Sequence, residues 1–112
     1  MIEKAFFESL LKKKILILDG PMGTMIQKEN LKEDDFRGER FQNSKVNLMG
    51  NNDILNISKP DIIYNIHKSY LEVGADILET NTFNSTIISQ EDYQCQDLSL
   101  ELNFQGASIA KK

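Results

Sequence analysis

A short apolar run that ends in a tight turn constrains the fold of this chain more than any other feature. Ile15–Leu18 are four consecutive apolar residues, and Asp19-Gly20-Pro21 follows them directly. A continuous apolar run between turn residues is typical of a strand that is buried on both faces. Asp19 is then expected at the carboxyl end of a buried strand, which is where α/β proteins place their ligands.

Helices are predicted wherever apolar residues recur at helical spacing. The expected ranges are 3–13, 22–28, 60–73 and 97–110, with a helical turn or two at 86–93. The range 60–73 has the clearest signals, because Pro60 suits a first turn and Gly74 suits a C-terminal cap. Residues 29–59 are expected to form a long polar connection with weak periodicity.

A second strand is predicted at Ile77 and Leu78, followed by the polar run 79–82. The order strand, helix, strand, helix makes a βαβα unit, whose strands pair in parallel through a right-handed crossover. The carboxyl ends of both strands then lie at one edge, so Asp19 and residues 79–82 are expected to face one site. Two strands are too few for a stable parallel sheet. Residues 1–112 are therefore predicted to be one partial α/β domain, the opening βαβα portion of a TIM (β/α)8 barrel, a fold of about 250 residues.

Composition excludes several classes of protein. The net charge is -4 and no basic stripe stands out, which argues against a nucleic-acid surface. No apolar run reaches transmembrane length, and charged residues interrupt the apolar pattern that a signal peptide needs. The single cysteine, Cys95, cannot form an internal disulfide, which fits a reducing compartment. We therefore expect a cytoplasmic protein that binds neither nucleic acid nor membrane.

The segment Asp19–Thr24 has two interpretations that the spacing alone does not separate. It could hold a small polar ligand, with Asp19 accepting from an ammonium group and backbone N–H groups binding a carboxylate. It could equally be an ordinary turn in which Asp19 caps the following helix. It is not a P-loop, because no Gly-Lys-Ser/Thr follows.

Other candidate residues are weaker. Glu79 and Asp19 could form a carboxylate pair for acid–base chemistry, but a structural role for Glu79 is the preferred interpretation. His67 is the only histidine and lies within a predicted helix, which favours a helix-face role over catalysis or metal binding. Cys95 has no companion cysteine or nearby histidine, so it fits neither a metal site nor a catalytic dyad.

Several motifs together resemble one family. The segments are Leu-Asp-Gly-Pro-Met-Gly-Thr-Met at 18–25, Phe-Arg-Gly-Glu-Arg-Phe at 36–41, Gly-Asn-Asn-Asp at 50–53 and Gly-Ala-Asp-Ile-Leu-Glu-Thr-Asn-Thr-Phe at 74–83. The first and last resemble homocysteine S-methyltransferases in general. The two middle motifs are more specifically similar to the N-terminal, homocysteine-binding domain of cobalamin-dependent methionine synthases.

This resemblance implies a methyltransferase that moves a methyl group from methylcobalamin, recharged by 5-methyltetrahydrofolate, to zinc-bound homocysteine. It implies that the Asp19-Gly20 turn holds the amino-acid end of homocysteine, with Asn81, Thr82 and Phe83 nearby. The full set of expected substrate-binding residues is Asp19, Gly20, Met22, Gly23, Thr24, Glu79, Asn81, Thr82 and Phe83. No catalytic or metal-ligating residue is expected in this chain.

The zinc and methylcobalamin that the resemblance implies are expected to be held elsewhere in a complete enzyme. The expected partners are homocysteine, the remainder of the barrel, and folate and cobalamin domains on the same or a separate chain. We therefore expect these 112 residues to be inactive alone. Two other functions remain open at this stage: a zinc homocysteine S-methyltransferase that uses another methyl donor, and a non-catalytic binding or interaction module derived from the barrel.

Overall fold

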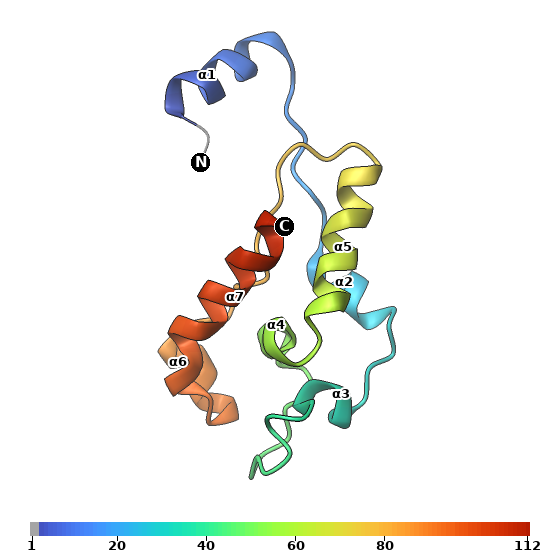
Figure 1. Ribbon diagram of the computed structural model, residues 1–112, viewed down its shortest axis with the longest axis vertical. Coiled ribbons are helices and arrows are strands. Elements are labelled where there is room, and N and C mark those ends of the chain that lie inside the picture. Colours follow the sequence, from blue (N-terminus) through green and yellow to red (C-terminus); the bar gives the residue numbers. More distant parts are fainter. Residues whose placement is uncertain (1–2) are drawn as a thin grey trace.

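The computed structural model describes residues 3–112, and helices are its regular elements (Figure 1). The longest are α1 (Lys4–Lys13), α5 (Pro60–Glu72) and α7 (Ser99–Lys111). Four shorter α-helices lie between them: α2 (Met22–Gln27), α3 (Glu33–Arg37), α4 (Leu55–Ser58) and α6 (Ile87–Gln90). Three single 3-10 turns complete the order: η1 (Asn52–Ile54), η2 (Glu91–Tyr93) and η3 (Gln96–Leu98).

The predicted α/β class is wrong. No strand and no sheet occurs between residues 3 and 112, so the chain is not a βαβα portion of a TIM barrel. The two segments expected as strands are extended and run in parallel, but they meet at a single isolated bridge between Leu18 and Ile77. The Asp19 N–H donates to the Ile77 carbonyl oxygen at 2.9 Å, and the Ile77 N–H donates to the Ile17 carbonyl oxygen at 3.1 Å.

The absence of cover explains why the apolar run does not become a buried strand. Ile15 is 89% exposed, and Ile17 and Leu18 are about half exposed. A parallel sheet is stable when further strands extend it and helices cover both faces. In the described chain no third extended segment pairs with these two, and no helix covers Ile15–Leu18. The apolar side chains of this run therefore have no surface to pack against.

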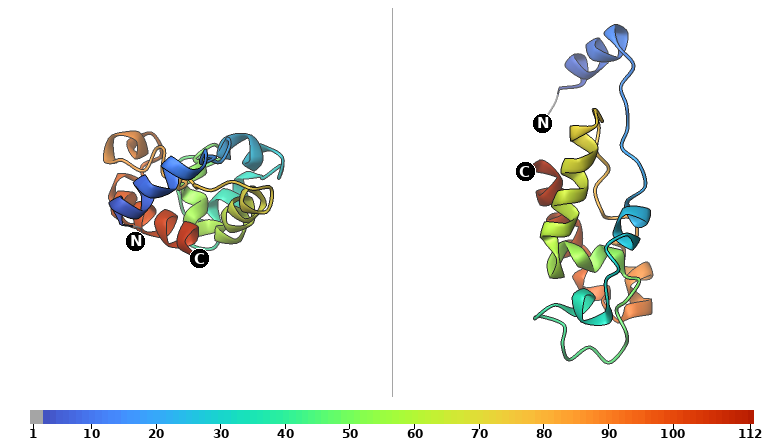
Figure 2. Two further views of the ribbon diagram at one scale, coloured as in Figure 1. Left: turned by 90° about the horizontal axis from the view of Figure 1, so that it is seen from above. Right: turned by 90° about the vertical axis from the view of Figure 1, so that its right-hand side faces the viewer.

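The core lies between the helices that follow the bridge. α4 is at its centre and contacts α3, α5 and α7 (Figures 1 and 2). The core side chains come from several helices, from the loop before η1 and from the turn between η2 and η3. They are Ile26, Phe36, Leu48, Ile54, Leu55, Ile63, Ile66, Cys95, Leu102 and Ile109. Burial of these apolar groups is the main force that holds the short helices together.

α1 lies apart from this core. None of its residues is buried, and it extends from one end of a molecule that measures 51 × 27 × 19 Å (Figure 2). The helix expected at 3–13 is therefore confirmed as a helix, but its apolar face has no cover. Phe6 is 56% exposed and Leu11 is 51% exposed.

The other long helices also agree with the periodicity. α5 begins at Pro60 and ends at Glu72, and Gly74 follows with a φ of 108°, a conformation that favours glycine. The connection at 29–59 is more structured than expected, since it contains α3, η1 and α4. Within residues 3–112, no helix combines the length and the apolar character needed to span a bilayer.

Candidate functional site

The turn between the bridge and α2 is fixed to the segment that follows α5. Besides its backbone bond to Ile77, Asp19 uses its side chain: Oδ2 accepts a hydrogen bond from the Glu79 N–H at 3.1 Å. Asp19 does not cap the next helix, which was one of the two sequence interpretations. Pro21 is the N-cap of α2, and no side chain caps this helix. The Asp19 carboxylate is therefore directed toward the Glu79 backbone.

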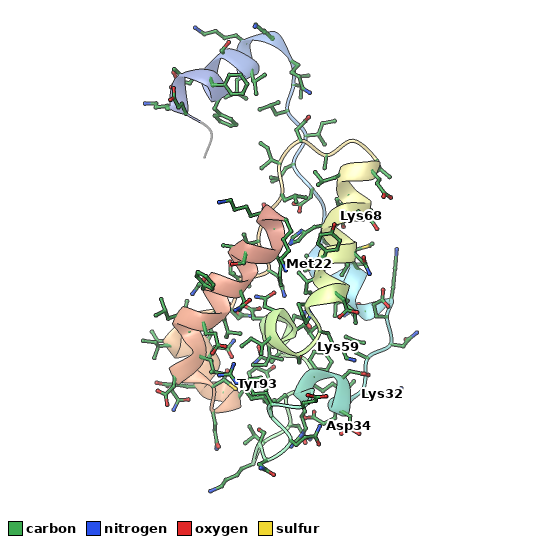
Figure 3. The ribbon with its side chains drawn as sticks, viewed as in Figure 1. Met22, Lys32, Asp34, Lys59, Lys68 and Tyr93 are labelled. Atoms are coloured by element: carbon green, nitrogen blue, oxygen red, sulfur yellow. The ribbon has the colours of Figure 1, made fainter. Side chains whose placement is uncertain are left out.

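Helix α5 supports the other side of this turn. The Tyr70 hydroxyl donates to the Pro21 carbonyl oxygen at 2.9 Å. A Cβ on Gly20 would lie 2.9 Å from that hydroxyl oxygen and 3.0 Å from the ring carbon Cε1. Only glycine lets the backbone approach the tyrosine this closely without displacing it. Met22, at the start of α2, packs against the core beside α5 (Figure 3).

The predicted site residues that follow the second extended segment, from Glu79 to Phe83, do not share one environment. Glu79 reaches Asp19 through its backbone N–H, and its own carboxylate is exposed, so the two acids do not form a hydrogen-bonded pair. Asn81 is 4% exposed and turned inward, where its Nδ2 donates to the Asn52 carbonyl oxygen at 2.9 Å and to Asn56 Oδ1 at 3.1 Å. Phe83 is 93% exposed.

Gly23, Thr24 and Thr82 complete the predicted set. Gly23 and Thr24 lie in the first turn of α2, where a Cβ on Gly23 would lie 3.8 Å from Asn52 Nδ2 and Thr24 is exposed. Thr82 exchanges a 2.7 Å hydrogen bond with Thr80 and packs against Gly106 of α7. The structure therefore brings Asp19, Gly20 and the Glu79 backbone together. Asn81, Thr82 and Phe83 lie away from this turn: Asn81 is in the interior, Thr82 is against α7 and Phe83 is exposed to solvent.

Buried polar pairs hold the segment after Glu79 in place, and they were not predicted from the sequence. Asp53 Oδ2 accepts from Ser85 Oγ at 2.6 Å and from the Asn84 N–H at 2.9 Å. Burial raises the pKa of Asp53, and these two bonds only partly oppose that effect. The side-chain amides of Asn51 and Gln90 bond to each other in both directions, at 2.9 and 3.1 Å. Residues in the weakly periodic connection thus serve as interior anchors.

The residues present do not fit a zinc site. Cys95 is 7% exposed, its thiol lies 3.3 Å from the Tyr93 carbonyl oxygen as a donor, and burial raises its pKa away from the thiolate that metals prefer. Nowhere in residues 3–112 do three or more His, Cys, Asp or Glu side chains gather closely enough to hold a metal ion.

Comparison with known families decides the relationship that the motifs suggested. A family profile described as homocysteine S-methyltransferase matches residues 16–112, which is most of the chain. The chain belongs to the homocysteine S-methyltransferase family. The match spans both the Asp19-Gly20 turn and the segment around Glu79. The family carries out methyl transfer, so the expected general kind of reaction is confirmed at the level of the family.

Proposed function

We propose that this chain supplies the homocysteine-binding turn of a methyltransferase of the cobalamin-dependent methionine synthase type. Membership of the homocysteine S-methyltransferase family supports the substrate. The Phe-Arg-Gly-Glu-Arg-Phe motif at 36–41 and the Gly-Asn-Asn-Asp motif at 50–53 support this particular type of enzyme. In such an enzyme the methyl group passes from methylcobalamin to the sulfur of zinc-bound homocysteine, and methionine is the product.

The placement of the Asp19 carboxylate carries the proposal. One oxygen accepts from the Glu79 N–H, which fixes the direction of the group while leaving acceptor positions on both oxygens. A carboxylate with open acceptor positions suits the three N–H donors of a ligand ammonium group, and such charge-assisted bonds are strong. The task of this chain is therefore to hold the amino-acid end of homocysteine, with the reacting sulfur directed elsewhere.

Zinc and methylcobalamin are assigned to other parts of the enzyme. The described side chains do not fit a zinc site, so no step of methyl transfer is assigned to them. We expect partner segments that carry the zinc ligands and the cobalamin and folate sites, on the same or a separate chain. The purified 112-residue chain, given homocysteine and methylcobalamin, should form no methionine above the protein-free background. Methionine formation above that background would overturn this division of tasks.

Calorimetric titration of L-homocysteine into the chain tests the binding role. Asp19→Asn should weaken binding by about tenfold or more, because a hydrogen bond to a charged group contributes roughly 1.5–3 kcal/mol. Asp92→Asn is the matched control, since Asp92 is an exposed aspartate on η2. Equal affinity of both variants, or no binding by the wild type, would contradict the proposal.

One observation favours a second candidate, an interaction module without catalysis. Ile15, Ile17 and Leu18 expose apolar surface beside the candidate turn, and contiguous exposed apolar groups mark contact surfaces. A module of this kind would not bind homocysteine, and Asp19→Asn would leave its partner binding unchanged. The same titration therefore separates the two functions. A third candidate, transfer from another methyl donor, would be separated by the methyl donor that the complete enzyme accepts.

A further inference from the structure

His67 is a buried polar side chain that the proposed function does not yet use. It is 3% exposed, and neither of its ring nitrogens has a hydrogen-bond partner within the described part of the chain. An unsatisfied buried donor or acceptor costs about 1–3 kcal/mol, and native structures contain few such groups. An apolar ring at this position on α5 would avoid the free-energy cost of the unpaired ring nitrogens. The presence of a histidine therefore suggests a functional role.

The position of His67 relates it to the candidate turn. Tyr70, three residues later on α5, bonds to Pro21 and contacts Gly20, and residues with this spacing share one helix face. Burial lowers the pKa of His67, and the charge of the Asp19 carboxylate opposes that effect. Lys68, labelled in Figure 3, marks this part of α5.

We propose that His67 is a positioning residue for Asp19: when a ligand ammonium group binds the Asp19 carboxylate, an imidazole N–H of His67 donates to the same carboxylate. This inference rests on the proposed function, because it concerns the same ammonium site. A neutral imidazole has one N–H donor. The Asp19 carboxylate can accept further bonds besides the one from the Glu79 N–H. Hydrogen bonds that are unformed in a free protein often form only when the ligand is bound.

The consequence is specificity for amino acids. A carboxylate held from two sides, by the Glu79 N–H and by His67, keeps its remaining acceptors aimed at one ammonium position. Preorganisation of this kind raises affinity, because the Asp19 side chain loses less conformational entropy when the ligand binds. A ligand that keeps the thiol and the carboxylate but lacks the amino group gains nothing from it. The ratio of affinities for L-homocysteine and 4-mercaptobutyrate therefore reports on the ammonium site at the Asp19 carboxylate.

The experiment measures this ratio by calorimetry for the wild-type chain and for three variants. Asp19→Asn and His67→Phe should each lower the ratio, the second by about tenfold, the loss expected for one charge-assisted bond. His67→Asn keeps a side-chain N–H near the position of Nδ1 and should recover part of the ratio. The affinity for 4-mercaptobutyrate should be the same in all four proteins.

The outcomes separate this inference from the proposed function. If His67→Phe weakens both ligands equally, the side chain is structural and the inference is overturned. If Asp19→Asn lowers the ratio and His67→Phe does not, the inference falls while the homocysteine-binding role stands. If Asp19→Asn leaves the ratio unchanged, both fall.

A second measurement on the native protein covers the case in which His67→Phe does not fold. The chain has one histidine, so its ring nitrogens give unambiguous nitrogen-15 resonances. L-Homocysteine should shift one protonated ring nitrogen toward the hydrogen-bonded range, and 4-mercaptobutyrate should not. Resonances that respond to neither ligand, or equally to both, would overturn the positioning role.

Discussion

Tyr70 holds the Asp19–Pro21 turn by two contacts at once: its hydroxyl donates to the Pro21 carbonyl oxygen at 2.9 Å, and its ring faces Gly20. The two contacts predict coupled substitutions. Gly20→Ala places a Cβ about 3 Å from the end of the tyrosine side chain, which must shift and give up its hydrogen bond to Pro21, so the fold should lose about 0.5–1.5 kcal/mol.

Tyr70→Phe removes the hydroxyl that the new Cβ would meet first and also the hydrogen bond, which contributes about 0.5–1.5 kcal/mol. The double variant should therefore lose less than the sum of the two single losses, by roughly 0.5 kcal/mol or more. Urea unfolding followed by circular dichroism measures all four proteins. Additive losses would show that the hydroxyl and Gly20 do not interact.

Two leucines on α7 differ in burial, so we expect them to contribute very differently to stability. Leu102 is fully buried, whereas Leu100 is 84% exposed. Leu102→Ala should lower the free energy of unfolding by about 2–5 kcal/mol, the range for buried leucines. Leu100→Ala is the matched control and should change it by no more than about 0.5 kcal/mol. Equal losses in chemical denaturation would contradict the placement of α7 on the core.

Gly106 reverses the usual preference for alanine over glycine in helices. It is buried on α7, and a Cβ there would lie 2.5 Å from Thr82 Cγ2. Alanine is ordinarily favoured by about 1 kcal/mol inside a helix, but this clash should make Gly106→Ala destabilising. Thr82→Ser removes the clashing methyl group and should recover part of the loss, as read from thermal unfolding, while Asn56 Nδ2, 3.0 Å from the added Cβ, accounts for the rest. A Gly106→Ala variant that is more stable than the wild type would show that α7 does not pack closely on residue 82.

Asp53 predicts a pH dependence of stability with a definite sign. Burial raises the pKa of Asp53, so between the ordinary aspartate pKa and the raised one the folded protein binds a proton that the unfolded chain has lost. The free energy of unfolding then contains a contribution from this group that is full at low pH and is lost as pH rises through the raised pKa.

Asp53→Asn removes the titration while keeping an oxygen that accepts from Ser85 and Asn84. The stability of the wild type minus that of the variant should therefore fall as pH rises above the ordinary aspartate pKa, about 4, and level off above the raised pKa of Asp53, measured by urea unfolding at each pH. Subtraction removes the effect of the other carboxyls, among them Glu33 and Glu101, whose lowered pKa values act in the opposite direction. If the stability of the wild type minus that of the variant rises with pH, the pKa of Asp53 is not raised by burial.

The sequence predicted local features well where the signal was local. Periodic apolar residues predicted helices at 3–13, 60–73 and 97–110, and the structure has α1, α5 and α7 there. It missed the interior role of Asp53 and His67, because polar residues in a weakly periodic stretch or within a helix give no sign of burial. Nothing in the spacing could show that Asn81 turns inward or that Tyr70 reaches Pro21.

What the sequence alone determined about this protein was its family and its long helices, since motifs and 3.6-residue periodicity are properties of neighbouring residues. The tertiary structure decided that the Ile15–Leu18 run stays exposed, and that its pairing with the segment at Ile77 ends at one bridge. It also decided that Asp19 turns to Glu79 rather than capping α2. The physical reason is that a strand is completed by distant partners, whereas a helix satisfies its own backbone hydrogen bonds within a few residues.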